Sequence, residues 1–301
     1  MFHARGFMQI LALPTAAATK KGILLMLLGI VLFTAMDALA KGLIARYPTP
    51  QVIWARFMGQ AVVVIILLGP GQILPTLNSR YPFLHIARSA FQLGATALFF
   101  ASLGYIGLAE ATALTDINPI LITLGAALFL GERLGPRRIF GVFLAMIGAL
   151  IVVRPGMGVF SLAALLPLGC AVCYAAASLL TRKLGQQEGP WTSLLHAALF
   201  GAIIMGFAMP FVWQPIAGTD LMKFAALGIL GTAAQLCVIR SFSMAEASAV
   251  APFAYIGIVF ATLWGIVLYN EYPDQYTVLG ALVIVAAGLH VWHRETATKR
   301  P

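Results

Sequence analysis

The sequence has little charge, and this shortage excludes most soluble proteins. Charged residues make up 10% of the 301 residues and 61% are hydrophobic, with a mean hydropathy of +0.94. A soluble domain carries about 25% charged residues, so this chain is expected to be solvated by lipid. Its net charge of +9 then reflects Lys and Arg clusters that anchor one face of a membrane. Nucleic-acid binding is therefore not expected.

Cysteine and catalytic motifs are scarce as well. The three cysteines supply no disulfide framework. Cys170 and Cys173 have the spacing of a metal or redox pair, but they lie in an apolar stretch without a second pair, so we interpret them as small residues at a helix contact. We expect no metal and no cofactor. The chain also lacks a nucleotide-binding motif, paired aspartates in adjacent spans and a His-x-x-x-His pattern, so neither a pump driven by ATP nor an enzyme is expected.

Long apolar runs, by contrast, fill the chain. A membrane-spanning helix needs about 20 predominantly apolar residues. Ten segments meet this requirement: 22–44, 50–69, 83–104, 108–130, 137–154, 159–182, 190–212, 221–242, 247–269 and 276–293. Only short turns separate them. The sequence therefore predicts an all-α polytopic membrane protein with ten transmembrane helices.

The basic residues lie mainly on one side of these spans. An even number of spans puts both termini on the same side, and we place that side in the cytoplasm. The bases on it are Arg5, Lys20, Lys21, Arg80, Arg133, Arg137, Arg138, Arg182, Lys183, Arg294, Lys299 and Arg300, whereas the opposite side has Arg46, Arg154 and Lys223. This bias is typical of cytoplasmic loops. We expect a multi-pass protein of the bacterial inner membrane, with cytoplasmic tails at 1–21 and 294–301; residues 1–18 also loosely resemble a signal peptide.

The second half of the chain repeats the first. Three features recur: Ala109-Glu110-Ala111 as Ala245-Glu246-Ala247, Gly131-Glu132 as Asn270-Glu271, and Gly141 as Gly280. We predict two five-helix repeats, at 22–154 and 159–293. Because five is odd, the second repeat must be inverted in the membrane. Inverted repeats allow alternating access around a central site.

The first repeat carries a motif found in a known family. The turn Gly131-Glu132-Arg133-Leu134, followed by Gly141 and Gly148 and preceded by Pro119, resembles the repeat signature of the EamA-like ten-helix carriers in the drug/metabolite transporter superfamily. The second repeat departs from this signature, because Ile258 stands where the proline would be. The resemblance implies a secondary carrier of a small organic solute. It leaves the oligomeric state open.

Two segments, 241–255 and 270–274, resemble one branch of that family. The branch includes uptake carriers for S-adenosylmethionine, and bacterial riboflavin carriers are placed close to it. The resemblance implies uptake of a cofactor-like metabolite. The predicted spans hold more bases than acids, which favours a neutral or anionic solute, so riboflavin is slightly preferred over S-adenosylmethionine. The alternative is an exporter of amino acids or toxic metabolites.

Polar side chains inside the spans are the candidates for the transport chemistry, because a charge near the bilayer centre costs at least about 2.5–3.5 kcal/mol. The candidates for solute binding or coupling are Asp37, Arg56, Arg88, Asp116, His196 and Arg240, with Trp54 and Tyr255 as aromatic walls. A coupling proton would use a carboxylate such as Asp37 or Asp116.

Four of the candidates also have a purely structural interpretation. Asp37 lies four residues before Lys41, so the two side chains share a helix face and can pair. Pro119 leaves a backbone carbonyl near residue 115 without its donor, so Asp116 either helps to bind a polar group or forms an ion pair with Arg88 or Arg56. Arg88 alternatively anchors the membrane interface, and His196 alternatively packs between helices.

Overall fold

The computed structural model describes residues 16–130, 136–153, 162–185, 187–245 and 250–298, and these residues form helices and no strands. The first half of the chain contains α1 (Ala16–Ile44), α2 (Thr49–Leu68), α3 (Pro70–Leu77), α4 (Pro82–Leu103), α5 (Leu108–Thr115), α6 (Asn118–Leu130) and α7 (Pro136–Val153). The second half contains η1 (Leu162–Ala164), α8 (Leu165–Leu184), α9 (Pro190–Gly206), α10 (Met209–Val212), α11 (Gly218–Met244), η2 (Ala251–Tyr255), α13 (Ile256–Tyr269) and α14 (Gln275–Thr298).

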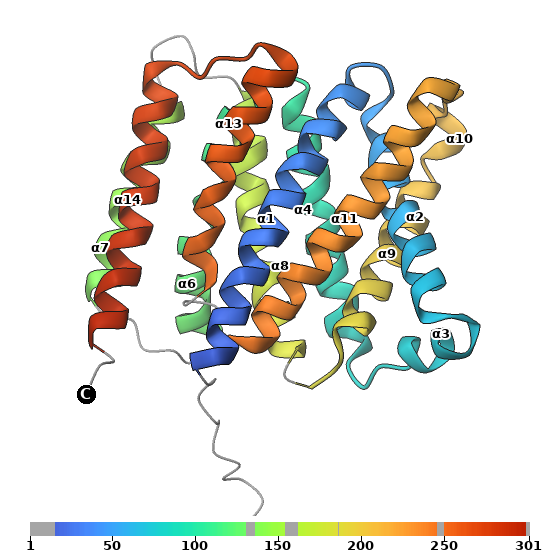
Figure 1. Ribbon diagram of the computed structural model, residues 1–301, viewed down its shortest axis with the longest axis horizontal. Coiled ribbons are helices and arrows are strands. Elements are labelled where there is room, and N and C mark those ends of the chain that lie inside the picture. The colour runs from blue at the N-terminus through green and yellow to red at the C-terminus, as the bar shows by residue number, and fades with distance from the viewer. Residues whose placement is uncertain (1–15, 131–135, 154–161, 186, 246–249, 299–301) are drawn as a thin grey trace, which may run out of the picture.

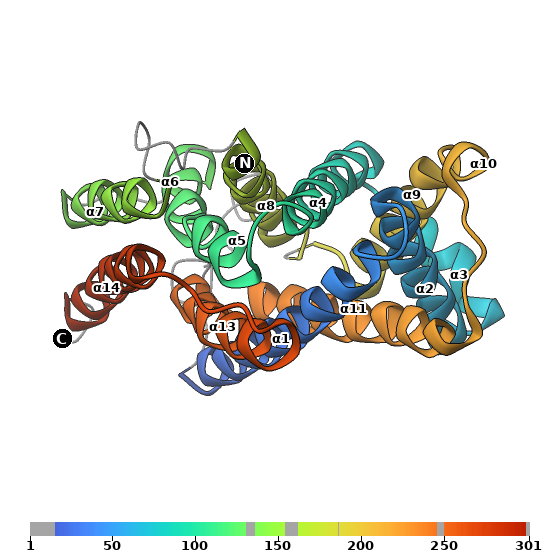
Figure 2. The same cartoon turned by 90° about the horizontal axis from the view of Figure 1, so that it is seen from above.

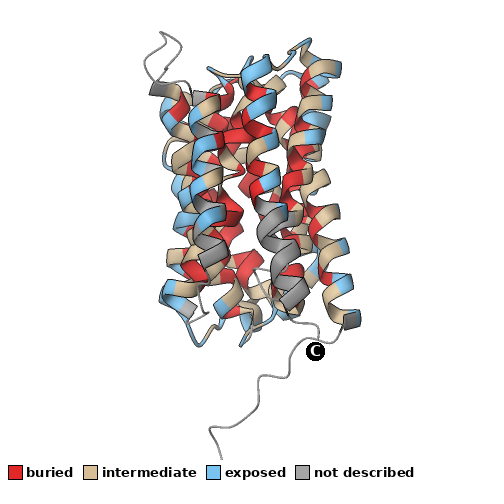
Figure 3. Ribbon diagram, turned by 90° about the vertical axis from the view of Figure 1, so that its left-hand side faces the viewer, coloured by how far each residue is buried: buried red, intermediate tan, exposed pale blue. Residues whose placement is uncertain are grey.

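Each segment expected to be a span contains helix in the structure. Among the described residues, six helical stretches are long and apolar enough to cross a membrane, with α5 and α6 counted as one, and three more are apolar but shorter. Large hydrophobic side chains cover the outside of the bundle, and Phe129, Phe143 and Val267 are more than 60% exposed. Buried residues lie on the inward faces (Figure 3). This is the distribution that a lipid solvent favours, and the chain is a polytopic membrane protein.

Helices of the two halves pack against one another. α1 runs along α11, and α4 runs along α8, while α7 packs on α14 and α2 on α9 (Figures 1 and 2). α1 begins and α14 ends at the same end of the bundle (Figure 1), which we call the terminal end. The other end is called the far end.

Glycines set the closest of these approaches. A Cβ atom on Gly59 of α2 would lie 2.8 Å from the Cα atom of Gly228 on α11, and a Cβ on Gly228 would lie 2.7 Å from the Cα of Gly59. Similarly, a Cβ on Gly148 of α7 would meet the carbonyl oxygen of Gly280 on α14 at 2.8 Å. In a membrane, small residues of this kind let backbones approach and gain van der Waals contact.

The fourth predicted span is broken. Helix α5 ends at Thr115 and α6 begins at Asn118, because Pro119 has no N–H to continue the hydrogen bonding of the preceding turn. The corresponding part of the second half is irregular as well, since the short 3-10 helix η2 precedes α13. Backbone that is not helical is tolerated at membrane depth where protein buries it or where it lines a cavity.

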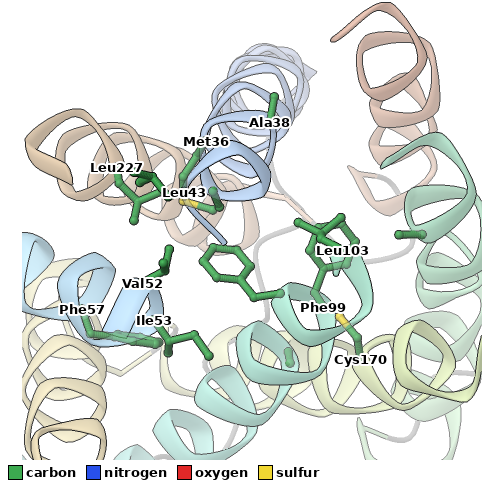
Figure 4. Close-up of a cluster of buried hydrophobic side chains, with 14 of the residues drawn as sticks. Met36, Ala38, Leu43, Val52, Ile53, Phe57, Phe99, Leu103, Cys170 and Leu227 are labelled. Atoms are coloured by element: carbon green, nitrogen blue, oxygen red, sulfur yellow. The ribbon is translucent and has the colours of Figure 1, made fainter. Parts of the chain in front are cut away.

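The main apolar core lies beside these broken segments. Most of its buried side chains come from α1, α2, α4 and α11, and others come from α5, α8, α9 and α13; Figure 4 shows part of this cluster. Phe57, which is fully buried, packs against Gly201 on α9. Met36, Phe99 and Cys170 belong both to this core and to the cavity described next. The core therefore holds the cavity wall in place.

Candidate functional site

A cavity of about 110 Å³ lies between α1, α2, α4, α8 and the break between α5 and α6. Ala254 of η2 and Gly257 of α13 also reach it, so both irregular segments contribute to its wall. Its polar lining residues are Thr34, Asp37, Arg56, Gln92, Thr96, Thr112, Thr115, Asp116, Asn118, Cys170 and Tyr174.

Three of the predicted site residues meet in this cavity: Asp37 from α1, Arg56 from α2 and Asp116 from the broken span. Asp37 is half-buried, whereas Arg56 is 1% and Asp116 is 6% exposed. No ion pair within 4.0 Å joins Arg56 to either carboxylate in the described part of the chain. The expected ion pair between Asp116 and Arg56 or Arg88 is therefore absent there.

Arg56 has weak partners. Its Nε donates to the Sδ of Met36 at 3.3 Å, and its guanidinium carbon lies 4.7 Å from the centroid of the Phe57 ring. Its Nη1 has no hydrogen-bond partner. A buried donor without a partner costs about 1–3 kcal/mol, and more when it is charged.

The broken span contributes unpartnered acceptors. Oδ2 of Asp116 and Oδ1 of Asn118 are buried without hydrogen-bond partners. The hydroxyl of Thr115 donates to the carbonyl of Ala111 at 2.9 Å. The cavity thus places a buried cationic donor on one wall and two unpartnered oxygens on another.

Neutral polar residues of the wall were missed by a search for ionisable groups. Gln92 of α4 accepts a hydrogen bond at 3.3 Å from Gln235 of α11, and this bond links the two halves of the chain. Thr96 and Thr112 donate to carbonyls one turn back in their own helices. The sequence does mark Gln92, because it is an amide in the middle of an apolar span and such groups hydrogen-bond across helices in membranes.

Arg88 and His196 lie outside the cavity, nearer the terminal end. Arg88 is fully buried and donates to the Oγ1 of Thr181 at 2.7 Å and to the carbonyl of Ser193 at 3.0 Å. These bonds connect α4 with α8 and α9, so Arg88 is buried and not an interfacial anchor. The His196 ring stacks on His85, with 4.6 Å between the centroids.

The three remaining candidates are also separate from the cavity lining. Trp54 packs edge-on against Trp213, with 5.7 Å between the ring centroids. Arg240 is exposed on α11. Tyr255 is buried with an unpartnered hydroxyl and lines a different hollow. That hollow, of about 520 Å³, lies along α13 and α14 and is lined almost entirely by apolar residues.

Pairing of Asp37 with Lys41, the structural interpretation of their spacing, does not occur. Lys41 instead reaches the carboxylate of Glu271, at 2.7 Å, and donates to the carbonyl of Ile106 at 3.0 Å. Glu271 also accepts from the backbone N–H of Leu108 at the start of α5. Sequence spacing missed this pair because Glu271 follows α13 and reaches α1 only through the tertiary fold. The contact closes the far end between the two halves. Its counterpart in the first repeat, Glu132, lies outside the described residues.

A second polar cluster joins the loops at the terminal end. The carboxylate of Glu188 lies 2.7 Å from Nε2 of His85 and accepts hydrogen bonds from the hydroxyl of Ser79 and the backbone N–H of Arg80. Burial of this carboxyl raises its pKa, but the hydrogen bonds outweigh that effect and hold the pKa of Glu188 below its ordinary value of 4.5. The cluster links the loop before α4 to the loop before α9.

Comparison with known proteins agrees with this architecture. A solved crystal structure superposes with a TM-score of 0.69 at 19% identity, covering 93% of this chain and 99% of the other, so the two share a fold. The pseudopaline exporter of Pseudomonas aeruginosa is 30% identical over 89% of this chain and 94% of its own length. The riboflavin transporter of Rhizobium johnstonii is 31% identical over 75% of this chain and 76% of its own length. The S-adenosylmethionine uptake transporter of Rickettsia bellii is 26% identical over 89% of this chain and 92% of its own length.

A model of one family matches the chain twice, over residues 20–154 and 161–291. These stretches divide the chain between α7 and α8, and each contains one of the broken segments that reach the cavity. The repeated sequence, the helical membrane fold and the polar central cavity agree with this match. The chain belongs to the EamA-like transporter family, within the drug/metabolite transporter superfamily.

Proposed function

We propose that the protein is a secondary carrier that moves a small organic metabolite through the central cavity by alternating access. The observation that carries this proposal is the cavity itself, where one guanidinium and two carboxylates come together without pairing. Embedded charges in membrane proteins commonly line a solute or ion pathway. With no nucleotide-binding motif in the sequence, a proton or ion gradient, solute exchange or the solute's own gradient drives the transport.

Ten spans in two inverted repeats, at 22–154 and 159–293, provide the mechanism. The packing supports this arrangement. In chain order, α1 corresponds to α8, α2 to α9, α4 to α11 and α7 to α14. Exchanging each helix for its counterpart turns the α1–α11 contact into the α8–α4 contact. The same exchange maps α7–α14 and α2–α9 onto themselves. A protein with this pseudo-symmetry reaches its second conformation when the halves swap their local arrangements.

The cavity is too small for a metabolite in the present conformation. Pockets for organic ligands measure about 300–1,000 Å³, whereas this one measures about 110 Å³. The structure therefore resembles a closed intermediate, with the Lys41–Glu271 contact at the far end and the Glu188 cluster at the terminal end. Solute entry requires one of these ends to open.

The solute is a cofactor-like metabolite, either riboflavin or S-adenosylmethionine. An excess of bases in the spans would favour riboflavin, but the charge balance of the cavity is what bears on the solute. Arg88 and Arg240 now lie outside the cavity, which holds two acids and one base. The charge balance thus no longer opposes a cationic solute, and S-adenosylmethionine stands equal to riboflavin.

The proposal is tested by uptake into reconstituted vesicles. Vesicles preloaded with unlabelled S-adenosylmethionine or riboflavin are mixed with the labelled compound, and transient accumulation is measured. Saturable counterflow of either compound identifies a carrier, and flux that does not saturate contradicts one. Growth of strains that cannot make riboflavin or S-adenosylmethionine, at low external supply, then tests uptake in cells.

Export is the second candidate, because an exporter is among the relatives at 30% identity. The same fold serves both directions. Counterflow in vesicles combined with failure to rescue either strain favours export. The exported solute would then be identified as a metabolite that cells without the protein tolerate less well when it accumulates inside them.

A further inference from the structure

We propose that the central cavity recognises a zwitterionic α-amino carboxylate group on its solute, with Arg56 holding the carboxylate and Asp116 and Asn118 holding the ammonium. This inference rests on the proposed carrier function and specifies the chemistry of its site. It identifies a class of solute and does not identify one compound.

Arg56 is a buried donor without a strong acceptor. Arg56 is 1% exposed, its Nη1 has no hydrogen-bond partner, and its described contacts are a thioether and an aromatic ring. A guanidinium presents donors in a rigid fork that matches a carboxylate. Asp37 attracts the guanidinium across the cavity, but neither it nor Asp116 lies within 4.0 Å of it. A solute carboxylate would supply the direct partner that the folded chain does not.

Asp116 and Asn118 supply the acceptors on the opposite side of the proposed site. Oδ2 of Asp116 and Oδ1 of Asn118 are buried, unpartnered and two residues apart, and both residues line the same cavity as Arg56. An ammonium group has three donors and no acceptor, so it satisfies both oxygens at once. The break in the helix at residues 116–117 is what brings the two side chains to the wall together.

The charged groups of the cavity do not form an internal ion pair. Had the cavity been a structural ion pair, Arg56 and Asp116 would lie within 4.0 Å of each other, as Lys41 and Glu271 do at 2.7 Å. Opposite charges that share a small cavity without pairing leave room for groups of opposite sign between them. The α-amino carboxylate group carries both signs on neighbouring atoms.

The test compares solutes on the unaltered protein in lipid nanodiscs. S-adenosylhomocysteine and methylthioadenosine share the thioadenosine part, and only the first has the α-amino carboxylate. Methionine has that group without the nucleoside, and riboflavin lacks it. We expect saturable binding of S-adenosylhomocysteine or methionine, and binding of methylthioadenosine weaker than that of S-adenosylhomocysteine by about 10- to 100-fold, as expected for charged hydrogen bonds.

Variants then assign the two ends. Arg56→Gln should weaken the binding of S-adenosylhomocysteine by about tenfold or more and leave the binding of methylthioadenosine unchanged. Arg56→Lys should keep part of the affinity for S-adenosylhomocysteine. Asp116→Asn should behave as Arg56→Gln does. Arg240→Gln, an exposed arginine outside the cavity, is the matched control and should bind as the unaltered protein does.

Three results would overturn the inference. They are equal binding of methylthioadenosine and S-adenosylhomocysteine, equal weakening of both by Arg56→Gln, and saturable counterflow of riboflavin without binding of any zwitterionic probe. The last result leaves the proposed carrier function intact. Absence of saturable binding and counterflow for all the probes contradicts both proposals.

Discussion

At the scale of single residues, position in the fold decides which buried charges face a cavity. Arg88 and Arg56 are both fully buried arginines in apolar helices, yet Arg88 donates to two oxygens from neighbouring helices while Arg56 faces a cavity. Burial of an ion is costly in both cases. Only Arg56 is left with that cost in a place that a solute can reach.

Asp37 is the residue at which we expect proton coupling. The residue is half-buried, lines the cavity and forms no hydrogen bond to another described residue, so opening of either end would let a proton reach its carboxyl. Asp37→Asn should abolish accumulation driven by a pH gradient and preserve counterflow, which needs no coupling. Uptake into vesicles with and without the gradient measures both.

Asp220→Asn provides the control for that experiment. Asp220 is a buried carboxylate at the far end whose partners are Arg46, Tyr47 and Lys223, and it does not line the cavity. Its neutralisation should leave the gradient dependence unchanged. If the transport rate did not depend on pH and neither Asp37→Asn nor Asp116→Asn changed it, proton coupling through these groups would be ruled out.

Glu188 gives a prediction for stability. Because its pKa is lower in the folded protein than in the unfolded chain, the folded state gains stability above pH 4.5 and loses it as the pH falls through the lowered pKa. Glu188→Gln should therefore reduce the melting temperature at pH 7. The difference in melting temperature between the variant and the unaltered protein should be smaller at pH 3. Thermal unfolding of the purified protein in detergent at both pH values checks this. An equal difference at both values would contradict it.

At the scale of helices, close packing in this protein depends on missing side chains. Gly59→Ala places a Cβ within 2.8 Å of the backbone of Gly228, so α2 and α11 must separate. We expect a loss of about 1–3 kcal/mol of stability, as for overpacked cores. Gly71→Ala is the matched control, because Gly71 also lies in a helix but has nothing within 4 Å of its Cβ position. Melting temperatures distinguish the two, and an equal change in both would show that the glycine contact is unimportant.

The broken span is the helix feature with the clearest functional meaning. Pro119 in the sequence predicts a freed carbonyl near residue 115, and the structure has a gap between α5 and α6 at that place. What the motif does not predict is that Asp116 and Asn118 reach the same cavity as Arg56. A proline specifies a local break because it removes a donor, whereas the neighbours of that break come from other helices.

At the scale of the whole molecule, the proposed orientation is open to a direct test. The bias of Lys and Arg predicts that the terminal end faces the cytoplasm. Tyr272→Cys lies at the exposed far end and Lys183→Cys at the exposed terminal end. In a background without Cys170, Cys173 and Cys237, a membrane-impermeant maleimide should label residue 272 in intact cells and residue 183 only after permeabilisation. The opposite pattern would invert the topology.

The sequence by itself determined that this protein is a helical membrane protein of two similar halves, because apolar length, basic loops and repeated motifs are local properties of the chain. It also supplied Asp37, Arg56 and Asp116 as candidates, since any charge in an apolar run is conspicuous. Only the tertiary structure decided that these three share a cavity, that Arg88, His196 and Arg240 lie elsewhere, and that Lys41 pairs with Glu271. The reason is physical: a charge is expensive in any span, but whether it pairs or faces a cavity depends on helices that are distant in the sequence.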